Sequence, residues 1–427
     1  MKHHSPTSAA RILSTLFRNY GGAIAVRLWD GTALRFGSRE PTVTVIFRDP
    51  RAFRELVLYR DPVRLAHAFF LGSVDVEGDI YDAVALRDHL ARLALSFREK
   101  LSILTAALLA AGGNRAAPAG AARAAASASA SAQGNSLASI AFHYDISNEF
   151  YRLWLDPEMT YSCAYFENAG DTLEEAQHAK LDLVCRKLRL RPGERLLDIG
   201  CGWGSLVIRA AQRFGVSALG ITLSRDQFDL ATARVRELGL ADRVSIEQRD
   251  YRDLPGEPLF DKIASVGMFE HVGLANLPRY FGTAHRLLKP GGLFLNHGIT
   301  SCEEGWRKGV STEFINRFVF PDGELDTVSN VLRAMEQSRF EVIDVESLRP
   351  HYALTLRHWV RRLEANREAG VRIVGEELYR VWRLYMAASA LQFESGETGI
   401  YQILLARSRE PWAAPLTRRD FLVSPQA

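Results

Sequence analysis

A short strand that runs directly into three closely spaced glycines is the part of this sequence best suited to bind a charged ligand. The segment Leu196–Gly204 reads LLDIGCGWG, and a helical run, SLVIRAAQRF, follows it. Glycines at such a crossing permit a tight turn and let a ligand approach the backbone, while the amides at the start of the helix face it. A tight turn alone would also explain the glycines, but the flanking strand and helix favour a binding site.

The position of Asp198 indicates what kind of ligand the loop would hold. This acid lies at the end of the strand, before the glycines, whereas a dinucleotide-binding loop has its acid about 20 residues later. A carboxylate here suits a cofactor with positive charge, and S-adenosylmethionine carries an ammonium and a sulfonium but no pyrophosphate. The sequence therefore predicts an S-adenosylmethionine site, whose loop residues are Gly200, Cys201, Gly202, Trp203 and Gly204.

Polar residues follow the next two predicted strands. Thr222, Ser224 and Gln227 offer hydroxyl and amide groups where a ribose would lie, although no acidic residue stands there. Tyr251 and Arg252 follow the third strand and would flank an adenine ring. A surface turn explains this last pair equally well when it is taken alone.

Seven short apolar segments alternate with helical patterns over residues 137–427 and predict an α/β catalytic domain with a parallel sheet covered on both faces. The pairing direction of the last two does not follow from their pattern. The seven segments are residues 195–199, 216–223, 244–248, 262–266, 292–300, 340–347 and 401–408.

The first part of the chain, residues 1–110, predicts a smaller α+β domain. Residues 22–49 alternate apolar and polar side chains, and residues 50–108 have helical apolar spacing. Residues 111–136 contain mainly alanine, serine and glycine, which predicts a flexible linker, with a transient helix as the alternative.

Composition excludes several classes of protein. The net charge of +3 lacks the concentrated basic footprint of a nucleic-acid binder but suits contact with anionic lipid. The four cysteines have neither a C-x-x-C pair nor a metal-ligand spacing, so no metal site or disulfide framework is predicted. The longest apolar stretch, residues 101–111, is too short to cross a bilayer. We therefore expect a cytoplasmic protein that associates peripherally with the inner face of the cell membrane.

Four further motifs stand in order around the glycine loop. They are HYDISNEFYRLWLDPEMTYSCAYF at 143–166, VGMFEHVG at 266–273, FLNHGIT at 294–300 and LRPHYALTL at 348–356. With the loop, they closely resemble the cyclopropane-fatty-acyl-phospholipid synthases and the related mycolic acid cyclopropane synthases. The resemblance implies a class I S-adenosylmethionine-dependent methyltransferase fold, with a Rossmann-like, seven-stranded, doubly wound sheet and a lipid tunnel over the cofactor.

The resemblance also implies roles for particular residues. Tyr161 and Ser162 would join the loop, the Thr222–Gln227 segment, Tyr251 and Arg252 in binding S-adenosylmethionine. The family holds a bicarbonate ion beside the transferred methyl group. Its ligands correspond here to Cys163, Glu270, His297, Tyr352 and the backbone of Ile299.

Each of these residues also has an ordinary structural explanation. Glu270 and its neighbour could form a solvated pair, His297 could be a core histidine, Tyr352 could cap a helix, and Cys163 could be a small buried apolar group. Two positions depart from the family pattern. Asn296 adds an amide to an apolar strand, and Ser389 stands where relatives often carry a cysteine.

The chemistry of methyl transfer to an alkene suits these residue types. An isolated cis double bond is a weak nucleophile, so it must be held against the sulfonium methyl with water excluded. The resulting carbocation can be stabilised by aromatic faces, which Tyr161, Tyr165, Trp203 and Phe269 would provide. Ring closure needs a small, weak base, and bicarbonate held by donors from tyrosine and histidine and by an accepting carboxylate meets that need.

We therefore expect cyclopropane formation on unsaturated acyl chains of membrane phospholipids. Methylation without ring closure is the alternative, and a partner reductase would then saturate the branched chain. A small-molecule oxygen or nitrogen methyltransferase is a third reading, and a lipid-binding module without catalysis is a fourth, against which the intact loop and Glu270 argue. The arginine-rich helices of residues 48–67 predict that the N-terminal domain docks on the membrane or forms a homodimer.

Overall fold

The structure is a computed structural model that divides the chain into two compact units. Unit 1 contains residues 1–134 and 374–391, and unit 2 contains residues 135–373 and 392–427. Residues 374–391, which the sequence assigned to the catalytic domain, thus group with the N-terminal unit. The predicted linker, residues 111–136, lies outside the described residues, which are 6–59, 61–109, 146–306, 309–319, 323–409 and 415–422.

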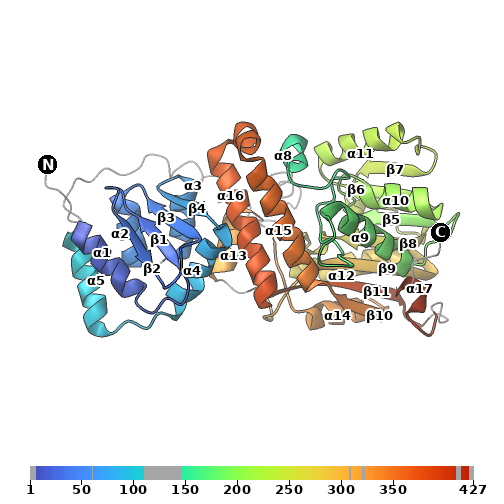
Figure 1. Cartoon of the computed structure of the whole chain (residues 1–427). Coiled ribbons are helices and arrows are strands. Elements are labelled where there is room, and N and C mark those ends of the chain that lie inside the picture. The colour runs from blue at the N-terminus through green and yellow to red at the C-terminus, as the bar shows by residue number, and fades with distance from the viewer. Residues whose placement is uncertain are drawn as a thin grey trace. The chain divides into compact units, whose positions relative to one another are not determined.

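Unit 2 is built on a seven-stranded sheet with the order β10-β11-β9-β8-β5-β6-β7 (Figure 1). Neighbouring strands from β9 to β7 run parallel, whereas β11 is antiparallel to both β9 and β10. All seven predicted strands are confirmed. They are β5 (Arg195–Ile199), β6 (Ser217–Thr222), β7 (Val244–Gln248), β8 (Phe260–Val266), β9 (Leu288–Ser301), β10 (Phe340–Ser347) and β11 (Thr398–Arg407).

Helices bury both faces of this sheet, as the doubly wound prediction requires. One core cluster joins the sheet to α9, α10 and α11 through Leu181, Leu206 and Val235, and the other joins it to α12 and α14 through Phe281 and Val331. The helices of this unit are α8 (Asn148–Arg152), α9 (Leu173–Lys187), α10 (Ser205–Phe214), α11 (Arg225–Glu237), α12 (Leu277–Leu287), α13 (Val310–Phe318), α14 (Val328–Gln337), α15 (Arg349–Ala365) and α17 (Arg419–Leu422), with short 3-10 turns η1 (Tyr251–Asp253), η2 (Phe269–His271) and η3 (Leu274–Asn276).

Local sequence signals fix where the helices beside the site begin. Thr172 and Glu175 form a capping box, in which each side chain accepts a hydrogen bond from the other residue's backbone N–H, so α9 starts at Leu173. Ser224 caps α11 by accepting from the N–H of Gln227 at 3.4 Å. These caps fix the first turns of α9 and α11.

Unit 1 contains a four-stranded sheet with the order β2-β1-β3-β4. The predicted helical stretch over residues 50–108 is wrong at residues 74–78, because VDVEG pairs along its whole length with β3 as an edge strand. Sequence periodicity cannot show such long-range pairing in five residues. The elements are α1 (Pro6–Leu16), β1 (Ile24–Arg27), β2 (Ala33–Phe36), β3 (Val43–Phe47), α2 (Pro50–Tyr59), α3 (Pro62–Phe70), β4 (Val74–Gly78), α4 (Ile80–Arg92) and α5 (Phe97–Leu109).

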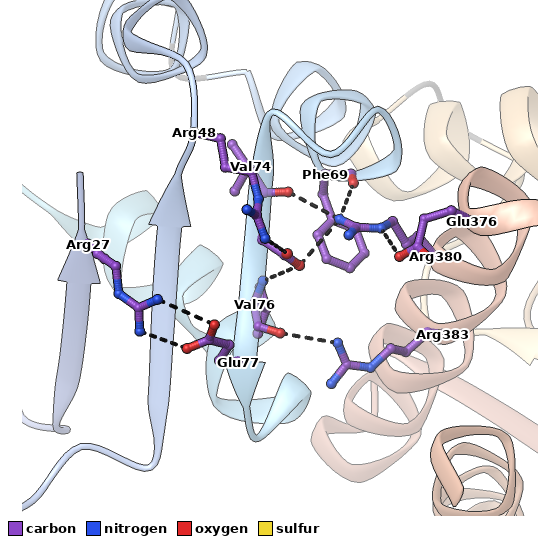
Figure 2. Close-up of polar contacts among 10 residues, drawn as sticks. Arg27, Arg48, Phe69, Val74, Val76, Glu77, Glu376, Arg380 and Arg383 are labelled. Carbon is purple, nitrogen blue, oxygen red and sulfur yellow. Dashed lines mark hydrogen bonds and ion pairs between the residues drawn. The ribbon is translucent and has the colours of Figure 1, made fainter. Parts of the chain in front are cut away.

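The exposed edge of β4 is covered by the part of α16 (Arg367–Ser395) that belongs to unit 1. Gly375 has φ +82° and ψ 162°, which breaks the helix where the chain enters this unit. Arg380 donates to the carbonyls of Phe69 and Val74 at 3.0 and 3.4 Å, and Arg383 donates to the carbonyl of Val76 at 3.5 Å (Figure 2). Arg380 and Arg383 thereby satisfy the carbonyls of Val74 and Val76, which an edge strand would otherwise leave open.

Candidate active site

The glycine loop after β5 has the backbone that the sequence predicted. Gly200, Gly202 and Gly204 have φ values of +84°, +55° and +83°, a region that other residues rarely adopt. The N–H groups of Gly200 and Cys201 both donate to the carbonyl of Ile221, at 3.0 and 2.9 Å, which ties the loop to the end of β6. The loop then leads directly into α10 (Ser205–Phe214), whose first-turn amides have no partner within the helix.

Asp198 lies beneath this loop as a buried carboxylate. Only 2% of the residue is exposed, and its Oδ1 has no hydrogen-bond partner among the described residues. Burial raises the pKa of Asp198 to about 7, while the nearby Lys180 ammonium opposes the shift. Its cross-strand neighbours are Gly220 and Ala264, two of the smallest residues. A buried oxygen without a partner is suited to a cationic group on a ligand.

The residues predicted to hold the ribose converge at the end of β6. The Thr222 hydroxyl donates to Oε1 of Gln227 at 2.7 Å, and the N–H of Ser224 donates to the Thr222 hydroxyl at 3.3 Å. All three side chains are buried. They form one polar cluster beside the glycine loop, since β5 and β6 are parallel neighbours that end at the same edge.

Tyr251 and Arg252 form the turn η1 just after β7. The Arg252 guanidinium donates to both carboxylate oxygens of Asp250, at 2.9 and 2.6 Å, so its charge is balanced within the turn. The half-buried Tyr251 ring meets Tyr280 edge to face at 5.4 Å between centroids. This pair therefore lies at the same sheet edge as the loop, one strand beyond the Thr222 cluster.

Tyr161 and Ser162 are positioned by α9, through residues that sequence reasoning missed. Gln177 donates to the carbonyls of Thr160 and Ser162, at 3.2 and 2.9 Å, and the Lys180 ammonium donates to the Ser162 hydroxyl at 2.6 Å. Burial lowers the pKa of Lys180 to about 8, and the nearby acidic groups oppose that shift. The only sequence signal for these contacts was the spacing between Gln177 and Lys180. Residues three positions apart lie on the same face of a helix.

Aromatic rings surround Tyr161. Its centroid lies 5.6 Å from Tyr151, 5.4 Å from Trp154 and 5.2 Å from Trp359, and Tyr151 lies 5.0 Å from Trp203. Two of the four predicted aromatic residues, Tyr161 and Trp203, therefore share one cluster.

The other two predicted aromatic residues lie outside that cluster. Tyr165 stacks on His351 at 4.7 Å. Phe269 packs in the core so closely against Gly298 that a Cβ there would lie 2.0 Å from its Cε1. Gly298 is therefore needed where Phe269 and η2 approach β9.

Glu270 and His297 present buried polar atoms that no described residue satisfies. Glu270 accepts from the N–H of Ile299 through Oε1 at 2.7 Å, while its Oε2 has no partner. Burial raises the pKa of Glu270 to about 7. His297 is 1% exposed, and its Nε2 likewise has no partner among the described residues. The N–H of Ile299 thus orients the Glu270 carboxylate.

A series of contacts through Leu348 and Ile400 links Cys163 and Tyr352 to β11 and, through strand pairing, to Ile299 on β9. The Cys163 thiol lies 3.8 Å from the carbonyl of Leu348, which also accepts from the N–H of Tyr352 at 3.1 Å. The N–H of Leu348 donates to the carbonyl of Ile400 at 2.9 Å, and Ile400 pairs with Ile299 across β11 and β9.

The five residues implied as bicarbonate ligands are thus linked in one connected region, in which the Ile299 N–H donates to Glu270. Within it, burial holds the pKa of Cys163 well above its usual range, so this residue is a thiol rather than a nucleophilic thiolate.

The two departures from the family pattern have distinct positions. Asn296 is fully buried and its Oδ1 accepts from the Tyr280 hydroxyl at 3.1 Å, which supplies the partner that the sequence did not reveal. Ser389 falls in the segment that groups with unit 1. Asn296 directly precedes His297 on β9, and its amide Nδ2 is a further buried atom that has no partner among the described residues.

Within the described residues, no group of three or more histidine, cysteine or acidic side chains is arranged to hold a metal ion. No helix in the same part of the chain is long and apolar enough to cross a membrane.

The fold and the site together define an S-adenosylmethionine-dependent methyltransferase. The family model for mycolic acid cyclopropane synthetase matches residues 132–403, and the chain belongs to this family. The structure is similar to that of mycolic acid cyclopropane synthase CmaA1 complexed with SAH and CTAB. The two share 35% sequence identity with a TM-score of 0.60, over 64% of this chain and 99% of the other.

Two sequence relatives differ in what their names state. A probable fatty acid methyltransferase from Pseudomonas putida is 40% identical over 93% of this chain and 95% of its own length. The cyclopropane-fatty-acyl-phospholipid synthase of Escherichia coli is 39% identical over 63% of this chain and 67% of its own length. The comparisons thus establish the enzyme family and its methyl donor.

Proposed function

We propose that this enzyme transfers a methyl carbon from S-adenosylmethionine to the cis double bond of unsaturated phospholipid acyl chains and closes a cyclopropane ring. The observation that carries the proposal is the pair of unpartnered buried atoms, Oε2 of Glu270 and Nε2 of His297, in the region that also contains Tyr352. The similarity to the Escherichia coli cyclopropane-fatty-acyl-phospholipid synthase supports the choice of substrate.

The cofactor end of the site has the groups that S-adenosylmethionine requires. When bound, this cofactor supplies an electrophilic methyl group on a sulfonium. The Asp198 carboxylate balances a positive charge from within the sheet, and Thr222 and Gln227 offer hydrogen bonds at the end of β6. The aromatic cluster of Tyr161, Trp203 and their neighbours provides ring faces that stabilise a cation without forming a bond to it.

The catalytic end of the site fits a bicarbonate ion. A bound bicarbonate would supply the weak base that removes a proton from the newly attached methyl carbon. An acceptor at Glu270 Oε2 and a donor at His297 Nε2 match the hydroxyl and the oxygens of such an ion. Because Glu270 binds the ion and does not contact the carbocation, it avoids forming a stable ester.

Methylation without ring closure is the second candidate. The Pseudomonas putida relative, which aligns over both the N-terminal region and the catalytic part, is named a probable fatty acid methyltransferase. In this case the proton would leave the adjacent chain carbon, and a partner reductase would saturate the resulting branched chain. The same Glu270 and His297 groups would hold the base.

Product analysis distinguishes the two candidates. The enzyme is incubated with S-adenosylmethionine and vesicles of a cis-monounsaturated phosphatidylglycerol, and the extracted acyl chains are examined by proton NMR. We expect cyclopropane ring protons, well upfield of the chain methylenes, in acyl groups that are heavier by one CH2 unit. Olefinic protons in chains one carbon heavier would replace this proposal by the second candidate. Transfer to a small-molecule acceptor alone would contradict both.

We also propose that the enzyme reaches its substrate by docking on the cytoplasmic face of the cell membrane through α5. The capping box of Ser96 and Glu99 fixes the start of this helix. Phe97 and Leu101 lie one turn apart and are 80% and 51% exposed, with Arg98 and Lys100 also exposed beside them. Apolar side chains flanked by basic residues suit the surface of an anionic bilayer. Homodimer formation by unit 1, which contains α5, stays a prediction.

Flotation of the full-length protein with vesicles tests the docking surface. Replacing both Phe97 and Leu101 with serine should lower the fraction bound to phosphatidylglycerol vesicles about tenfold, since two inserted side chains are lost. The matched control is Leu238→Ser, which removes an apolar side chain that is 48% exposed in unit 2. Unchanged flotation of the double variant would exclude α5 as the docking surface.

A further inference from the structure

A row of polar side chains crosses three strands of the catalytic sheet, from the partly exposed Glu346 to the buried His297. Glu346 on β10 is the cross-strand neighbour of Gln402 on β11, and Gln402 is the neighbour of His297 on β9. Directly paired residues project to the same face of a sheet. The last residue of α9, Lys187, reaches this row and contacts both Glu346 and Gln402. Lys187 and His297 are each 1% exposed, and Gln402 is fully buried.

Lys187 determines which way the Gln402 amide points. An ammonium has only donors, so it must face the amide oxygen, and Nζ lies 2.8 Å from Oε1 of Gln402. The amide Nε2 is thereby directed to Nδ1 of His297 at 3.3 Å. The reversed amide would place two donors together in a buried site. Glu346 pairs with the same ammonium, so the positive charge of Lys187 is not left uncompensated.

The orientation of Gln402 in turn determines where the His297 proton lies. The Gln402 amide nitrogen can only donate, so Nδ1 of His297 must accept and carries no hydrogen. The single hydrogen of a neutral imidazole is then on Nε2, the buried atom that lacks a partner. A charged imidazolium would place an N–H at Nδ1 against the amide N–H.

The surroundings of His297 also disfavour its charged form. Burial holds the pKa of His297 well below its usual range, and the Lys180 and Lys187 ammonium groups of α9 act in the same direction. On β10, Glu346 faces the row but is paired with Lys187. Glu270 reaches the region from η2.

We propose that Gln402 and Lys187 are positioning residues, which fix His297 as the neutral tautomer with its hydrogen on Nε2. His297 then acts only as a hydrogen-bond donor to an anion oxygen and never as the base. This role rests on the proposed function for the identity of the anion, but the tautomer itself does not. Gln402 and Lys187, which are distant in the sequence, thereby influence catalysis through His297 without contacting the substrate.

The tautomer can be measured without any assay of activity. In the full-length protein labelled with ¹⁵N-histidine, correlation spectra distinguish a protonated from an unprotonated ring nitrogen, and the variant His297→Asn assigns the signal. We expect a protonated Nε2 and an unprotonated Nδ1 from pH 6 to pH 8. A hydrogen on Nδ1, or a charged ring, would overturn the proposal even if the enzyme forms cyclopropane. Conversely, failure of lipid methylation would leave this measurement unaffected.

Substitution of Gln402 tests the consequence for catalysis. In Gln402→Glu an accepting carboxylate faces Nδ1 and should draw a hydrogen onto it, which removes the donor from Nε2. We expect kcat to fall on the order of 10- to 100-fold, as for other groups that orient a functional histidine, with the dissociation constant for S-adenosylmethionine unchanged. The control is Gln337→Glu, the same change at an exposed residue. A loss of activity without a change in the His297 spectrum would contradict the proposed role.

Lys187 provides a separate test through a conservative replacement. Lys187→Met removes the donor that orients the amide, so a mixture of His297 tautomers and a reduced kcat are expected. Lys187→Arg restores a cationic donor and should restore the single tautomer and most of the activity. A purely structural role for Lys187 would instead lower the melting temperature of Lys187→Met with no change in the histidine spectrum, and this outcome would exclude it as a positioning residue.

Discussion

Replacing Glu270 with glutamine should lower kcat for lipid methylation by about three orders of magnitude, in the range that follows loss of a group acting in proton transfer. The amide keeps the shape of the side chain and an oxygen for the Ile299 N–H, which now donates to Oε1 at 2.7 Å. It removes the negative charge, and Oε2 is replaced by a donor where an acceptor is needed. Binding of S-adenosylmethionine should stay within about twofold of the parent enzyme, because Glu270 does not belong to the cofactor cluster.

Steady-state methylation of vesicle lipids and calorimetric titration with S-adenosylmethionine measure these two quantities. The matched control is Glu336→Gln, the same substitution at an exposed position. Unchanged turnover of Glu270→Gln would refute the assigned role. Parallel losses of turnover and cofactor affinity would instead indicate a general disturbance of the site.

The pH dependence of kcat gives a second signature of the same carboxylate. Burial raises the pKa of Glu270 to about 7. Since Oε1 accepts from the Ile299 N–H, protonation would turn Oε2 into a donor, and ionisation makes it a strong acceptor. The activity of the parent enzyme should therefore rise with pH between about 6 and 8, and Glu270→Gln should lack this rise in its residual activity. Identical profiles for the two proteins would assign the titration to another group.

The parts of the site predicted from sequence are those whose chemistry depends on neighbouring residues in the chain. The strand, three glycines and helix around Gly202 dictate a loop conformation locally, and the structure has the expected positive φ values there. Likewise, the apolar segments of unit 2 are long enough and regularly enough spaced to predict all seven strands. The resemblance then grouped Cys163, Glu270 and His297, and the structure connects them through β9, β11 and Leu348.

What the sequence did not predict depends on contacts between distant residues. Lys180 and Lys187 look like ordinary polar positions of an amphipathic helix, yet both are buried, and Lys187 contacts Gln402, which is 215 residues away. Residues 374–391 group with unit 1, and Arg380 in this segment contacts residues more than 300 positions earlier. Without an observed pairing, a helical or strand period contains no information on such partners.

The two carboxylates of the site share an energetic property. Asp198 and Glu270 are both buried, each has an oxygen without a partner among the described residues, and burial raises the pKa of each to about 7. A group whose pKa is higher in the folded than in the unfolded protein stabilises the fold at low pH, and that stabilisation is lost as pH rises through the folded value. The free protein should therefore lose stability between about pH 5 and pH 8.

Replacing Asp198 with asparagine should separate binding from stability. We expect the Asp198 carboxylate to pair with the cofactor ammonium, and the change removes its charge. The dissociation constant for S-adenosylmethionine should therefore rise on the order of 10- to 100-fold, the usual value for a charge-assisted hydrogen bond. S-adenosylhomocysteine keeps the ammonium but lacks the sulfonium, so its affinity should fall by the same factor. A loss confined to S-adenosylmethionine would show that Asp198 faces the sulfonium instead.

The pH dependence of the same variant tests the physical cause. In the parent enzyme Asp198 must ionise to bind the cation, so affinity should increase with pH up to about 7 and level off above it, whereas the variant should show no such increase from this residue. The free variant should also lose less stability than the parent between pH 5 and pH 8, because it has one buried carboxylate fewer to ionise. Chemical denaturation at the two pH values measures this difference. Weaker binding together with a greater loss of stability at pH 8 would mean that Asp198 is mainly a structural partner of Lys180.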